Sequence, residues 1–202
     1  MKLYYLAGAC SLATYISLLE AGQKFEAHAV SRGDKRTDDG KDYFTINAKG
    51  YVPALVLDNG EVLTENVAVL SYVATLNPAA MLAPPMGTLG FFRVVEWLAF
   101  INSEVHKNFG MLFRPTTPDA AKAMAKENLQ LRLGYVEKTL GDEPWLTGRD
   151  FTVADAYLYV VLSWSGRVGV DLSSMPKLTD FLARGNARPT VIAARKGEGL
   201  NG

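Results

Sequence analysis

Residues 77–90 read NPAAMLAPPMGTLG, and this stretch separates two parts of the chain that differ in periodicity. Its three prolines and two glycines discourage regular secondary structure. Before it, short strand-like runs alternate with helical patterns, whereas beyond residue 90 the apolar residues follow a helical spacing throughout. We therefore expect an α/β domain over residues 1–78, a linker over 79–89 and an all-helical domain over 90–202.

The first part predicts the element order strand, helix, strand, long loop, strand, strand, helix. The runs KLYYL and FEAHAV flank a helix that begins near Ser11, and Gly22 stands where a helix C-cap belongs. After a loop over residues 31–50, the turn DNG joins the strand-like runs ALVL and EVL. A second helix is expected from about Glu65, and Pro78 should end it.

The second part predicts helices alone. FFRVVEWLAFINSEVHKNF predicts one long helix, and a leucine stripe from Leu129 to Leu140 predicts another. Thr152 and Asp155 fit a capping box, with Asp in place of the more common Glu or Gln. The helix that follows is apolar nearly all round and should occupy the centre of the domain. Two more helices are expected near residues 176–187 and 190–195.

Composition excludes several classes of function. The 21 Lys and Arg residues balance 21 Asp and Glu residues, and no basic patch is interleaved with aromatic residues, so nucleic acid is not an expected partner. No run approaches the roughly 18 apolar residues that a membrane span needs. The single cysteine allows no intrachain disulfide, which agrees with a cytoplasmic location. One Cys and two His offer no recognised metal-binding spacing.

Cys10 is placed directly before the first predicted helix. A helix N-terminus carries unpaired N–H groups and a partial positive charge, which favour a thiolate over a thiol. The alternative is that Cys10 is a small buried apolar residue. A CxxC redox pair is excluded, because Ala13 occupies the partner position.

Two further segments have the composition of a ligand-binding site. Val52-Pro53 enters a strand, and a cis bond there would leave the valine backbone free to pair with an extended peptide; an ordinary trans proline is the alternative. Glu65 and Asn66 begin a helix and suit the charged ends of an amino acid. Thr64 as a simple helix cap, with Glu65 complementing the helix dipole, is the other interpretation.

The long helix carries a small polar stripe. Ala99, Asn102, Ser103 and His106 follow the spacing i, i+3, i+4 and i+7 and should share a face, as in the lining of a cleft, although a structural histidine is the other interpretation. His28 lies within a predicted strand and is expected to be structural. The charged loop SRGDKRTDDGKD is typical of a solvated surface, but its Lys35 could reach an anionic ligand.

Taken together, these segments resemble the cytosolic glutathione transferases, and most closely the bacterial beta class. The resemblance covers the whole chain through MKLYYLAGACSL, KGYVPAL, LTE, EWL, SEVHKNF, FTVADAYL and GEGL, in this order and at matching spacing. It implies a thioredoxin-like N-terminal domain, an all-α C-terminal domain, a homodimer, and glutathione as co-substrate in a cleft between the domains, with no metal.

The resemblance also implies roles for individual residues. Cys10 would lie beside the glutathione sulfur, with His106 approaching from the helical domain. Val52 and Pro53 would hold the cysteinyl part, and Asn102 and Ser103 lie on the same stripe of the cleft. The residues implied for the rest of the site are Glu65 and Asn66 for the γ-glutamyl end, Lys35 near the glycine carboxylate, and Glu104 across the dimer.

This chain departs from the beta class at two positions. Asn66 stands where Gly or Ser is common, and it keeps a donor and an acceptor. Ala99 stands where Asn is frequent, and the lost polar contact puts the affinity of the site in question unless Asn102 replaces it.

The implied activity is transfer of alkyl or aryl groups to the glutathione sulfur, as in detoxification. Lowering a thiol pKa of about 8.5 by about two requires roughly 2.7 kcal/mol, which the helix terminus and hydrogen bonds from Cys10 and His106 could supply. Tyr5 and Ser11 compete with Cys10 for this role. The candidate wall of the electrophile pocket, which could equally be core, consists of Phe109, Phe113, Tyr157 and Trp164.

Two other functions stay open at this point. Cys10 could form a mixed disulfide with glutathione in a thiol transferase or peroxidase. The second open function is that of a non-catalytic protein that binds glutathione or apolar ligands, and Ala99 is the feature that favours this function.

Overall fold

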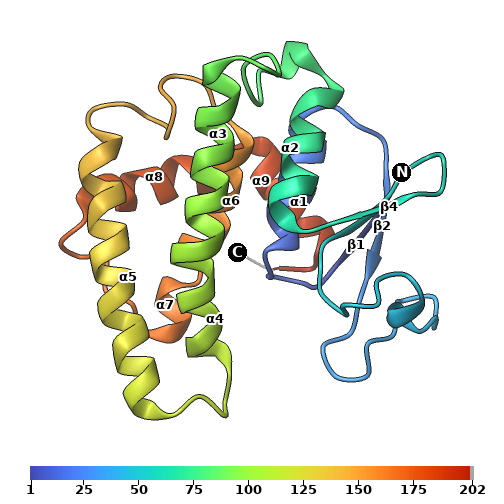
Figure 1. Cartoon of the computed structure of the whole chain (residues 1–202), viewed down its shortest axis with the longest axis horizontal. Helices are drawn as coiled ribbons and strands as arrows, with labels where there is room; N and C mark the ends of the chain where they lie inside the picture. The colour runs from blue at the N-terminus through green and yellow to red at the C-terminus, as the bar shows by residue number, and fades with distance from the viewer. Residues whose placement is uncertain (201–202) are drawn as a thin grey trace.

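The structure is a computed structural model that describes residues 1–200, in which an α/β part and a helical part lie side by side (Figure 1). The order of elements in the α/β part confirms the predicted one. Its elements are β1 (Lys2–Tyr5), α1 (Ser11–Glu20), β2 (Glu26–Ala29), a 3-10 turn (Tyr43–Thr45), β3 (Ala54–Val56), β4 (Val62–Thr64) and α2 (Asn66–Leu76).

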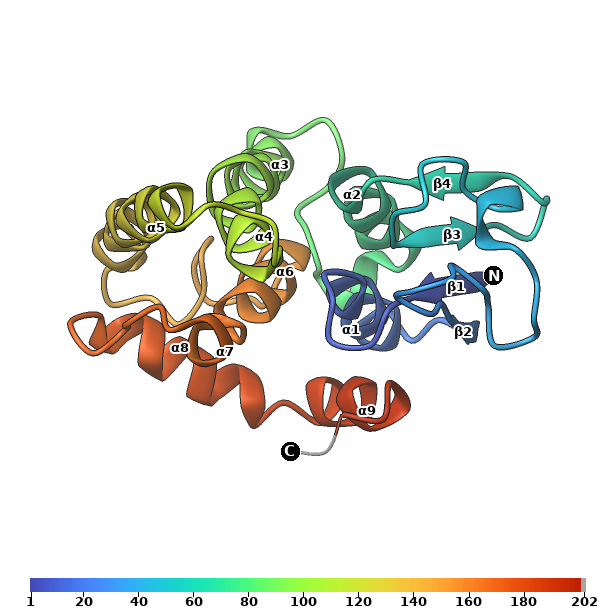
Figure 2. The same ribbon diagram turned by 90° about the horizontal axis from the view of Figure 1, so that it is seen from below.

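The four strands form one sheet in the order β2-β1-β3-β4. β1 pairs in parallel with β2 and antiparallel with β3, so Leu3 lies between Ala27 and Leu55. Leu3 and Leu55 are fully buried and belong to the same core as α1 and α2, which cover one face of the sheet (Figure 2). On the other face, Tyr4 packs against Tyr43 of the loop that follows β2. The alternation of side chains along β1 thus supplies both layers.

The helical part begins after a 3-10 turn (Pro78–Ala80) and an irregular stretch. Its first helix is longer than FFRVVEWLAFINSEVHKNF and contains a π-helical segment: α3 (Leu89–Phe100) continues through Ile101–His106 into α4 (Lys107–Phe113). The remaining helices are α5 (Asp119–Leu140), α6 (Val153–Leu162), the short α7 (Ser165–Val168), α8 (Pro176–Asn186) and α9 (Pro189–Gly197).

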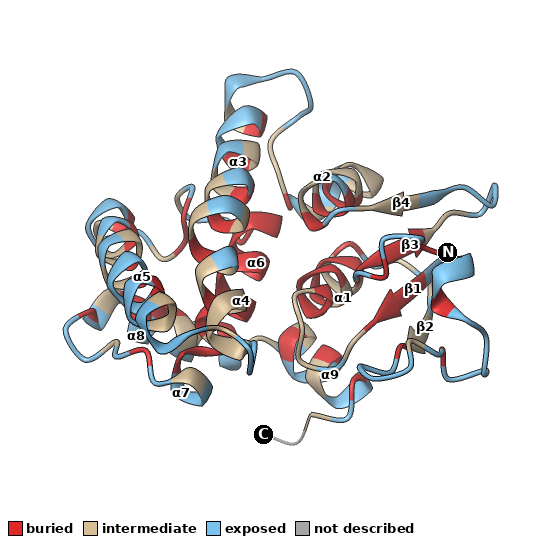
Figure 3. Ribbon diagram, turned by 60° about the horizontal axis from the view of Figure 1, so that its bottom comes forward, coloured by how far each residue is buried: buried red, intermediate tan, exposed pale blue. Residues whose placement is uncertain are grey.

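Helix α6 is the centre of the helical part, as predicted from a sequence that is apolar nearly all round. Every residue from Val153 to Leu162 is buried (Figure 3). The predicted capping box is confirmed: the Asp155 carboxylate accepts hydrogen bonds from Thr152 N at 2.8 Å and Thr152 Oγ1 at 2.7 Å, and also from Leu146 N at 2.8 Å. Burial raises the pKa of Asp155 to about 6.

The loop before Cys10 is held by residues from the far end of the chain. The backbone N–H of Gly8 donates to Glu198 Oε2 at 2.8 Å, and Trp164 Nε1 donates to the Gly8 carbonyl at 2.9 Å. Arg188 pairs with Glu20 at 2.7 Å where α9 lies against α1. The two parts therefore share a core and these polar contacts. The two hydrogen bonds of Gly8 hold the segment that leads into α1 in place. Within residues 1–200, no helix combines the length and apolarity that crossing a bilayer requires.

Candidate functional site

A cavity of about 650 Å³ opens between the α/β part and the helix formed by α3 and α4. Eight residues singled out from the sequence line it together: Cys10, Lys35, Val52, Pro53, Glu65, Asn66, Asn102 and His106. They come from the start of α1, the loop after β2, the entry to β3, the start of α2 and the π-helical segment. Segments distant in the sequence thus meet at one cleft of a size typical for a small ligand.

Cys10 is the N-cap residue of α1, and its thiol donates a hydrogen bond to the Val52 carbonyl at 3.4 Å. Burial raises the pKa of Cys10 from 9.0 to about 12, although backbone N–H groups of Cys10 and Ser11 act in the opposite direction. The expectation that the helix terminus makes Cys10 a thiolate is therefore wrong. At neutral pH the group is a thiol, which can donate a hydrogen bond into the cleft.

Tyr5 and Ser11, the two alternatives to Cys10 for stabilising the glutathione thiolate, are buried inside the protein. Ser11 is fully buried, and its hydroxyl accepts a hydrogen bond from Leu6 N at 3.2 Å. Tyr5 is 8% exposed and packs edge-on against Tyr15. Neither residue lines the cavity, so Cys10 is the one of the three that faces it.

The Val52-Pro53 peptide bond is cis, one of the two conformations considered from the sequence. Two buried side chains hold the turn before this bond: the Tyr51 carbonyl accepts hydrogen bonds from Tyr43 Oη and Asn47 Nδ2, both at 2.7 Å. Val52 and Pro53 both line the cavity next to Cys10.

Helix α2 begins with a strained residue. Glu65 is the N-cap and has φ +68°, a conformation that is costly for a residue with a side chain and often found where a ligand binds. Its carboxylate pairs with Lys49 at 2.5 Å. Thr64 is the last residue of β4 and does not cap the helix, so that interpretation is wrong.

Asn66 is buried at the first position of α2. Its side chain accepts a hydrogen bond from Thr14 at 3.2 Å and donates one to the Cys10 carbonyl at 3.4 Å. The amide therefore ties α2 to α1 beneath Cys10, and what it offers a ligand is chiefly its backbone N–H at the helix start.

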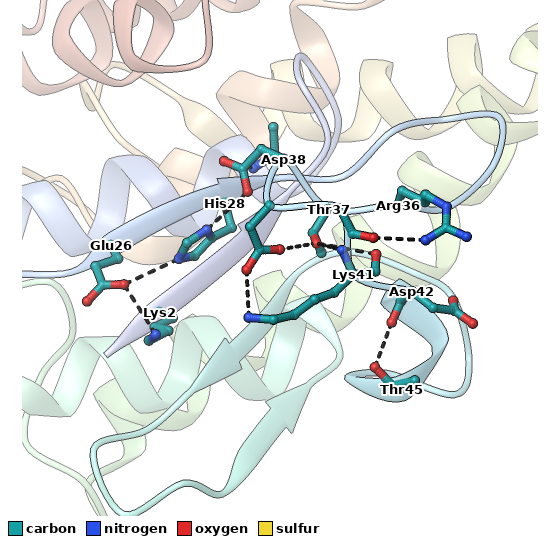
Figure 4. Close-up of polar contacts among 12 residues, drawn as sticks. Lys2, Glu26, His28, Arg36, Thr37, Asp38, Lys41, Asp42 and Thr45 are labelled. Atoms are coloured by element: carbon teal, nitrogen blue, oxygen red, sulfur yellow. Dashed lines mark hydrogen bonds and ion pairs between the residues drawn. The ribbon is translucent and has the colours of Figure 1, made fainter.

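Lys35 is positioned by a loop that is exposed yet internally bonded. Figure 4 shows His28 between Glu26 and Asp38, and Arg36 donating to a backbone carbonyl of the same loop. His28 also stacks on Tyr4, which makes it structural, as expected. Lys35 has φ +55°, and its ammonium donates to the Gly50 carbonyl at 3.0 Å, at the edge of the cavity.

The π-helical segment decides which residues of the predicted polar stripe reach the cleft. Asn102 and His106 line the cavity, whereas Ala99 and Ser103 are exposed and do not. The i→i+5 hydrogen bonds of a π-helix widen the turn, so residues three apart no longer share a face as they do in an α-helix. The prediction that all four residues share one face is therefore wrong. Glu104 points to the outer surface and pairs with Arg132 of α5 at 2.9 Å.

His106 is held by a neighbour from the central helix. Its Nδ1 lies 2.6 Å from Tyr157 Oη, and its ring is 5.0 Å from that of Trp164. Burial lowers the pKa of His106 to about 4, so the imidazole is neutral at neutral pH.

The four aromatic residues expected in a pocket wall lie behind the cleft. Tyr157 and Phe109 are fully buried, and the rings of Phe109 and Phe113 pack edge-on against Trp164. None of the four lines the cavity, so the expectation that they form a pocket wall is wrong and the alternative of a core position holds: Phe109, Tyr157 and Trp164 are buried in the core, and the half-buried Phe113 packs against it.

The helical side of the cleft contains residues that the sequence reasoning missed, namely Lys107, Gly110, Met111 and Arg114. Gly110 and Arg114 follow His106 at intervals of four residues, so the helical spacing in the sequence already indicated that they share its face. Arg32 and Asn47 on the other side were also missed. Among the residues that the structure describes, four cationic side chains and a single carboxylate, that of Glu65, line the cavity, which suits a ligand with more negative than positive charges. Within residues 1–200 no cluster of three or more His, Cys, Asp or Glu could hold a metal ion.

Comparison with known proteins gives matches along nearly the whole chain. Residues 7–76 match the family model of the glutathione S-transferase N-terminal domain, and residues 97–189 match that of the C-terminal domain. Glutathione S-transferase GstA of Escherichia coli O157:H7 is 44% identical over 200 residues, covering 99% of this chain and 100% of the relative.

Two solved structures resemble this chain over their full length. A sphingomonad glutathione S-transferase complexed with glutathione has a TM-score of 0.95 at 46% identity, with 100% of both chains covered. The bacterial beta class glutathione S-transferase of Sphingomonas chungbukensis has a TM-score of 0.96 at 45% identity, again with 100% of both chains covered.

Proposed function

Because the chain belongs to the glutathione S-transferase family, we propose that its cleft binds glutathione with the sulfur at the N-terminus of α1, between Cys10 and His106. The fold is a thioredoxin-like domain followed by an all-helical domain, as the resemblance implied, and the similar structures include beta-class enzymes. The protein is a glutathione transferase with glutathione as co-substrate. The roles of individual residues are our proposal.

The tripeptide would lie across the cleft in an extended form. Its cysteinyl part pairs with the Val52 backbone beside Pro53, as one more strand at the edge of the sheet. Its γ-glutamyl carboxylate lies at the start of α2, where Asn66 presents a backbone N–H, and its ammonium meets Glu65 in place of Lys49. Its glycine carboxylate lies near Lys35. The excess of cationic residues around the cavity supports this placement.

Cys10 would act as a hydrogen-bond donor to the glutathione thiolate, its single S–H hydrogen turning to that sulfur from the Val52 carbonyl, which accepts it in the structure. The observation that carries this role is the position of Cys10 at the N-cap of α1 and on the cavity wall. Burial raises the pKa of Cys10 to about 12, which agrees with a thiol that keeps its hydrogen. A hydrogen bond to a charged group contributes about 1.5–3 kcal/mol, and a weak S–H donor belongs at the lower end of that range. The helix N-terminus adds up to about 1 kcal/mol. Together these approach the roughly 2.7 kcal/mol that lowering a thiol pKa by about two requires.

The electrophile would approach along the helical side of the cleft. Gly110 and Met111 of α4 form an apolar wall there, and Gly110 leaves space because it has no side chain; Leu6, from the loop after β1, also lines the cavity. We assign this wall the role first expected of the buried aromatic residues. The activated sulfur attacks an electrophilic carbon held against it.

A redox function through Cys10 is less well supported. Disulfide exchange needs a thiolate, and burial keeps Cys10 protonated. A non-catalytic role rested on Ala99, which is exposed and lies outside the cavity wall.

A homodimer is the assembly that the exposed surface favours. Phe92 on α3 and Leu131 and Tyr135 on α5 are more than half exposed, and Tyr135 packs beside Phe100 of α3 at 5.4 Å. Glu104 and Ser103 lie on this outward surface, which agrees with a role for Glu104 across a dimer.

Replacing Cys10 with Ala tests the proposed function. We expect the thiol pKa of bound glutathione, followed by thiolate absorbance, to rise by about one, because one hydrogen bond to the anion is lost. Ser11→Ala and Tyr5→Phe should leave this pKa unchanged, since neither side chain lines the cavity. An unchanged pKa in the Cys10 variant would remove the assignment. A mass increase of one glutathione that reductant reverses would favour the mixed disulfide instead.

A further inference from the structure

A chain of three polar side chains runs from the core to the cleft behind the proposed sulfur site. Tyr157 Oη lies 2.6 Å from His106 Nδ1 and 3.0 Å from Asn102 Oδ1. Tyr157 belongs to the fully buried helix α6, while His106 and Asn102 belong to the π-helical segment and line the cavity. The hydroxyl is therefore shared between the two residues of that segment that reach the cleft.

Counting hydrogens assigns the direction of both bonds. A tyrosine hydroxyl has one hydrogen, and an amide oxygen can only accept, so the contact with Asn102 Oδ1 uses the hydroxyl hydrogen. The 2.6 Å contact with His106 must then use a hydrogen on Nδ1. The other ring nitrogen, Nε2, makes no hydrogen bond within residues 1–200 and is not fully buried. As a neutral imidazole carries one hydrogen, Nε2 then carries a lone pair, on a residue that lines the cavity.

The pKa shifts of Tyr157 and His106 agree with the protonation states that this assignment of hydrogens requires. Burial raises the pKa of Tyr157 well above its ordinary value, so the hydroxyl keeps its hydrogen. Burial alone lowers the pKa of His106, with no contribution from any charged group in residues 1–200. Both side chains are therefore neutral at neutral pH, and the arrangement of hydrogens is set by Asn102 as the terminal acceptor.

We propose that Tyr157 is a positioning residue that, with Asn102 as its acceptor, holds His106 in the Nδ1–H tautomer and thereby makes His106 the base that receives the proton of the glutathione thiol. This inference rests on the proposed function and deepens it. Cys10 and His106 then have different roles at one sulfur: Cys10 donates a hydrogen bond, and His106 accepts the proton.

The proton transfer balances within the site. The glutathione S–H bond breaks, its electron pair stays on sulfur, and an N–H bond forms at His106 Nε2. The resulting imidazolium donates from Nε2 to the thiolate and from Nδ1 to Tyr157 Oη. The adjacent negative charge favours the protonated ring and raises its pKa above that in the protein without glutathione, as in other paired thiolate–imidazolium sites. The thiolate bonds to the electrophilic carbon, and the leaving group departs with the bonding electrons.

The tautomer can be observed directly, because the chain has two histidines. In ¹⁵N-labelled protein without glutathione, long-range ¹H–¹⁵N correlation should show His106 with a protonated Nδ1 and an unprotonated Nε2; a His28→Gln variant assigns the signals. In Asn102→Ala the Tyr157 hydrogen loses its acceptor and should turn to His106, which reverses the tautomer. An Nε2–H tautomer in the unaltered protein would overturn the proposal.

Kinetics of Tyr157→Phe test the consequence for the reaction. With glutathione and a generic aryl halide, we expect kcat/KM at pH 6.5 to fall about tenfold and the acidic limb of its pH profile to move about one pH unit higher, while KM for glutathione changes less than twofold. Tyr159→Phe is the matched control, since Tyr159 is a buried tyrosine of the same helix whose hydroxyl donates to Asn186 Oδ1 at 2.7 Å, away from His106. Equal pH profiles for the two variants would reduce Tyr157 to a structural role and contradict the proposal.

The two proposals fail in different measurements. An unchanged thiol pKa in Cys10→Ala removes the proposed role of Cys10 but leaves the tautomer of His106 as measured. An Nε2–H tautomer in the protein without glutathione removes Tyr157 as the positioning residue whether or not Cys10 lowers the thiol pKa.

Discussion

At Cys10 the helix N-terminus and burial act in opposite directions on one thiol, and their relative sizes decide whether the thiol is ionised. A helix N-terminus stabilises an anion by about 1 kcal/mol, and by about 2 kcal/mol in favourable geometries. The rise of the Cys10 pKa from 9.0 to about 12 corresponds to roughly 4 kcal/mol against the thiolate. Burial therefore prevails, and the thiol that the sequence marks as reactive becomes a hydrogen-bond donor.

Glu198 is the residue through which pH should act on stability. Its carboxylate is 6% exposed and accepts from Gly8 N, and burial raises its pKa from 4.5 to about 7. Among residues 1–200, its Oε1 has no hydrogen-bond partner. The folded protein therefore binds this proton more tightly than the unfolded chain. Its contribution to stability is complete below the unfolded pKa and is lost as pH rises through 7.

We expect the free energy of unfolding to increase by about 1 kcal/mol through this group between pH 8 and pH 6. Glu198→Gln keeps an acceptor for Gly8 and should remove this part of the pH dependence, which urea titrations at both pH values would measure. Glu137→Gln is the control, because its half-buried carboxylate also accepts backbone hydrogen bonds, from Lys177 and Leu178. If the Glu198 variant kept the full pH dependence, another group would be responsible.

Among the elements, the helix of α3 and α4 departs most from its sequence pattern. The π-helical turn at Ile101–His106 brings Asn102 and His106 to the cleft and leaves Ala99 and Ser103 on the outer surface. The substitution at Ala99 therefore does not alter the cavity wall.

Helix α6 depends on the turn that starts it. Asp155→Ala leaves three donors without their acceptor, namely Leu146 N, Thr152 N and Thr152 Oγ1. We expect a loss of about 3 kcal/mol in the free energy of unfolding at pH 7, measured by urea denaturation. Thr152→Val removes the hydroxyl alone and should cost about 1 kcal/mol. Equal losses in the two variants would show that the carboxylate has no role beyond its bond to the hydroxyl.

On the scale of the whole molecule, the outward surface of α3 and α5 predicts association between two copies. Phe92 and Leu131 are 55% and 64% exposed. Replacing either with Glu should shift the species seen in sedimentation equilibrium from two chains toward one, because a buried unpaired charge opposes association. Ile192→Glu, at a 54% exposed position on α9, should leave the dimer intact. A monomeric unaltered protein would disprove the dimer.

The fold was largely predictable from the sequence, and the site only in part. Cys10, Val52, Glu65 and His106 were found because each stands at a helix start, a strand entry or a regular spacing, which are local features. Arg114 extends the same spacing but lies beyond Phe109, where the sequence predicted the end of this helix, whereas the helix continues to Phe113.

Other residues could not be placed from local pattern. Trp164 and Tyr157 have the same sequence signature in a core as in a pocket wall, and only packing distinguishes the two. The contacts of Glu198 and Trp164 with Gly8 join distant parts of the chain, which no periodicity records.

The sequence by itself determined the order of elements, the break near residue 80, the family and eight of the residues that meet at the cleft. These depend on side-chain periodicity, turn chemistry and motifs, which act over a few neighbouring residues. Tertiary structure alone decided the ionisation of Cys10 and His106, the side of the helix on which Ser103 lies, and the hydrogen-bonded set of Asn102, Tyr157 and His106. Those depend on desolvation and on distances between segments remote in sequence, because a pKa or a hydrogen bond is set by the atoms around a group and not by its neighbours along the chain.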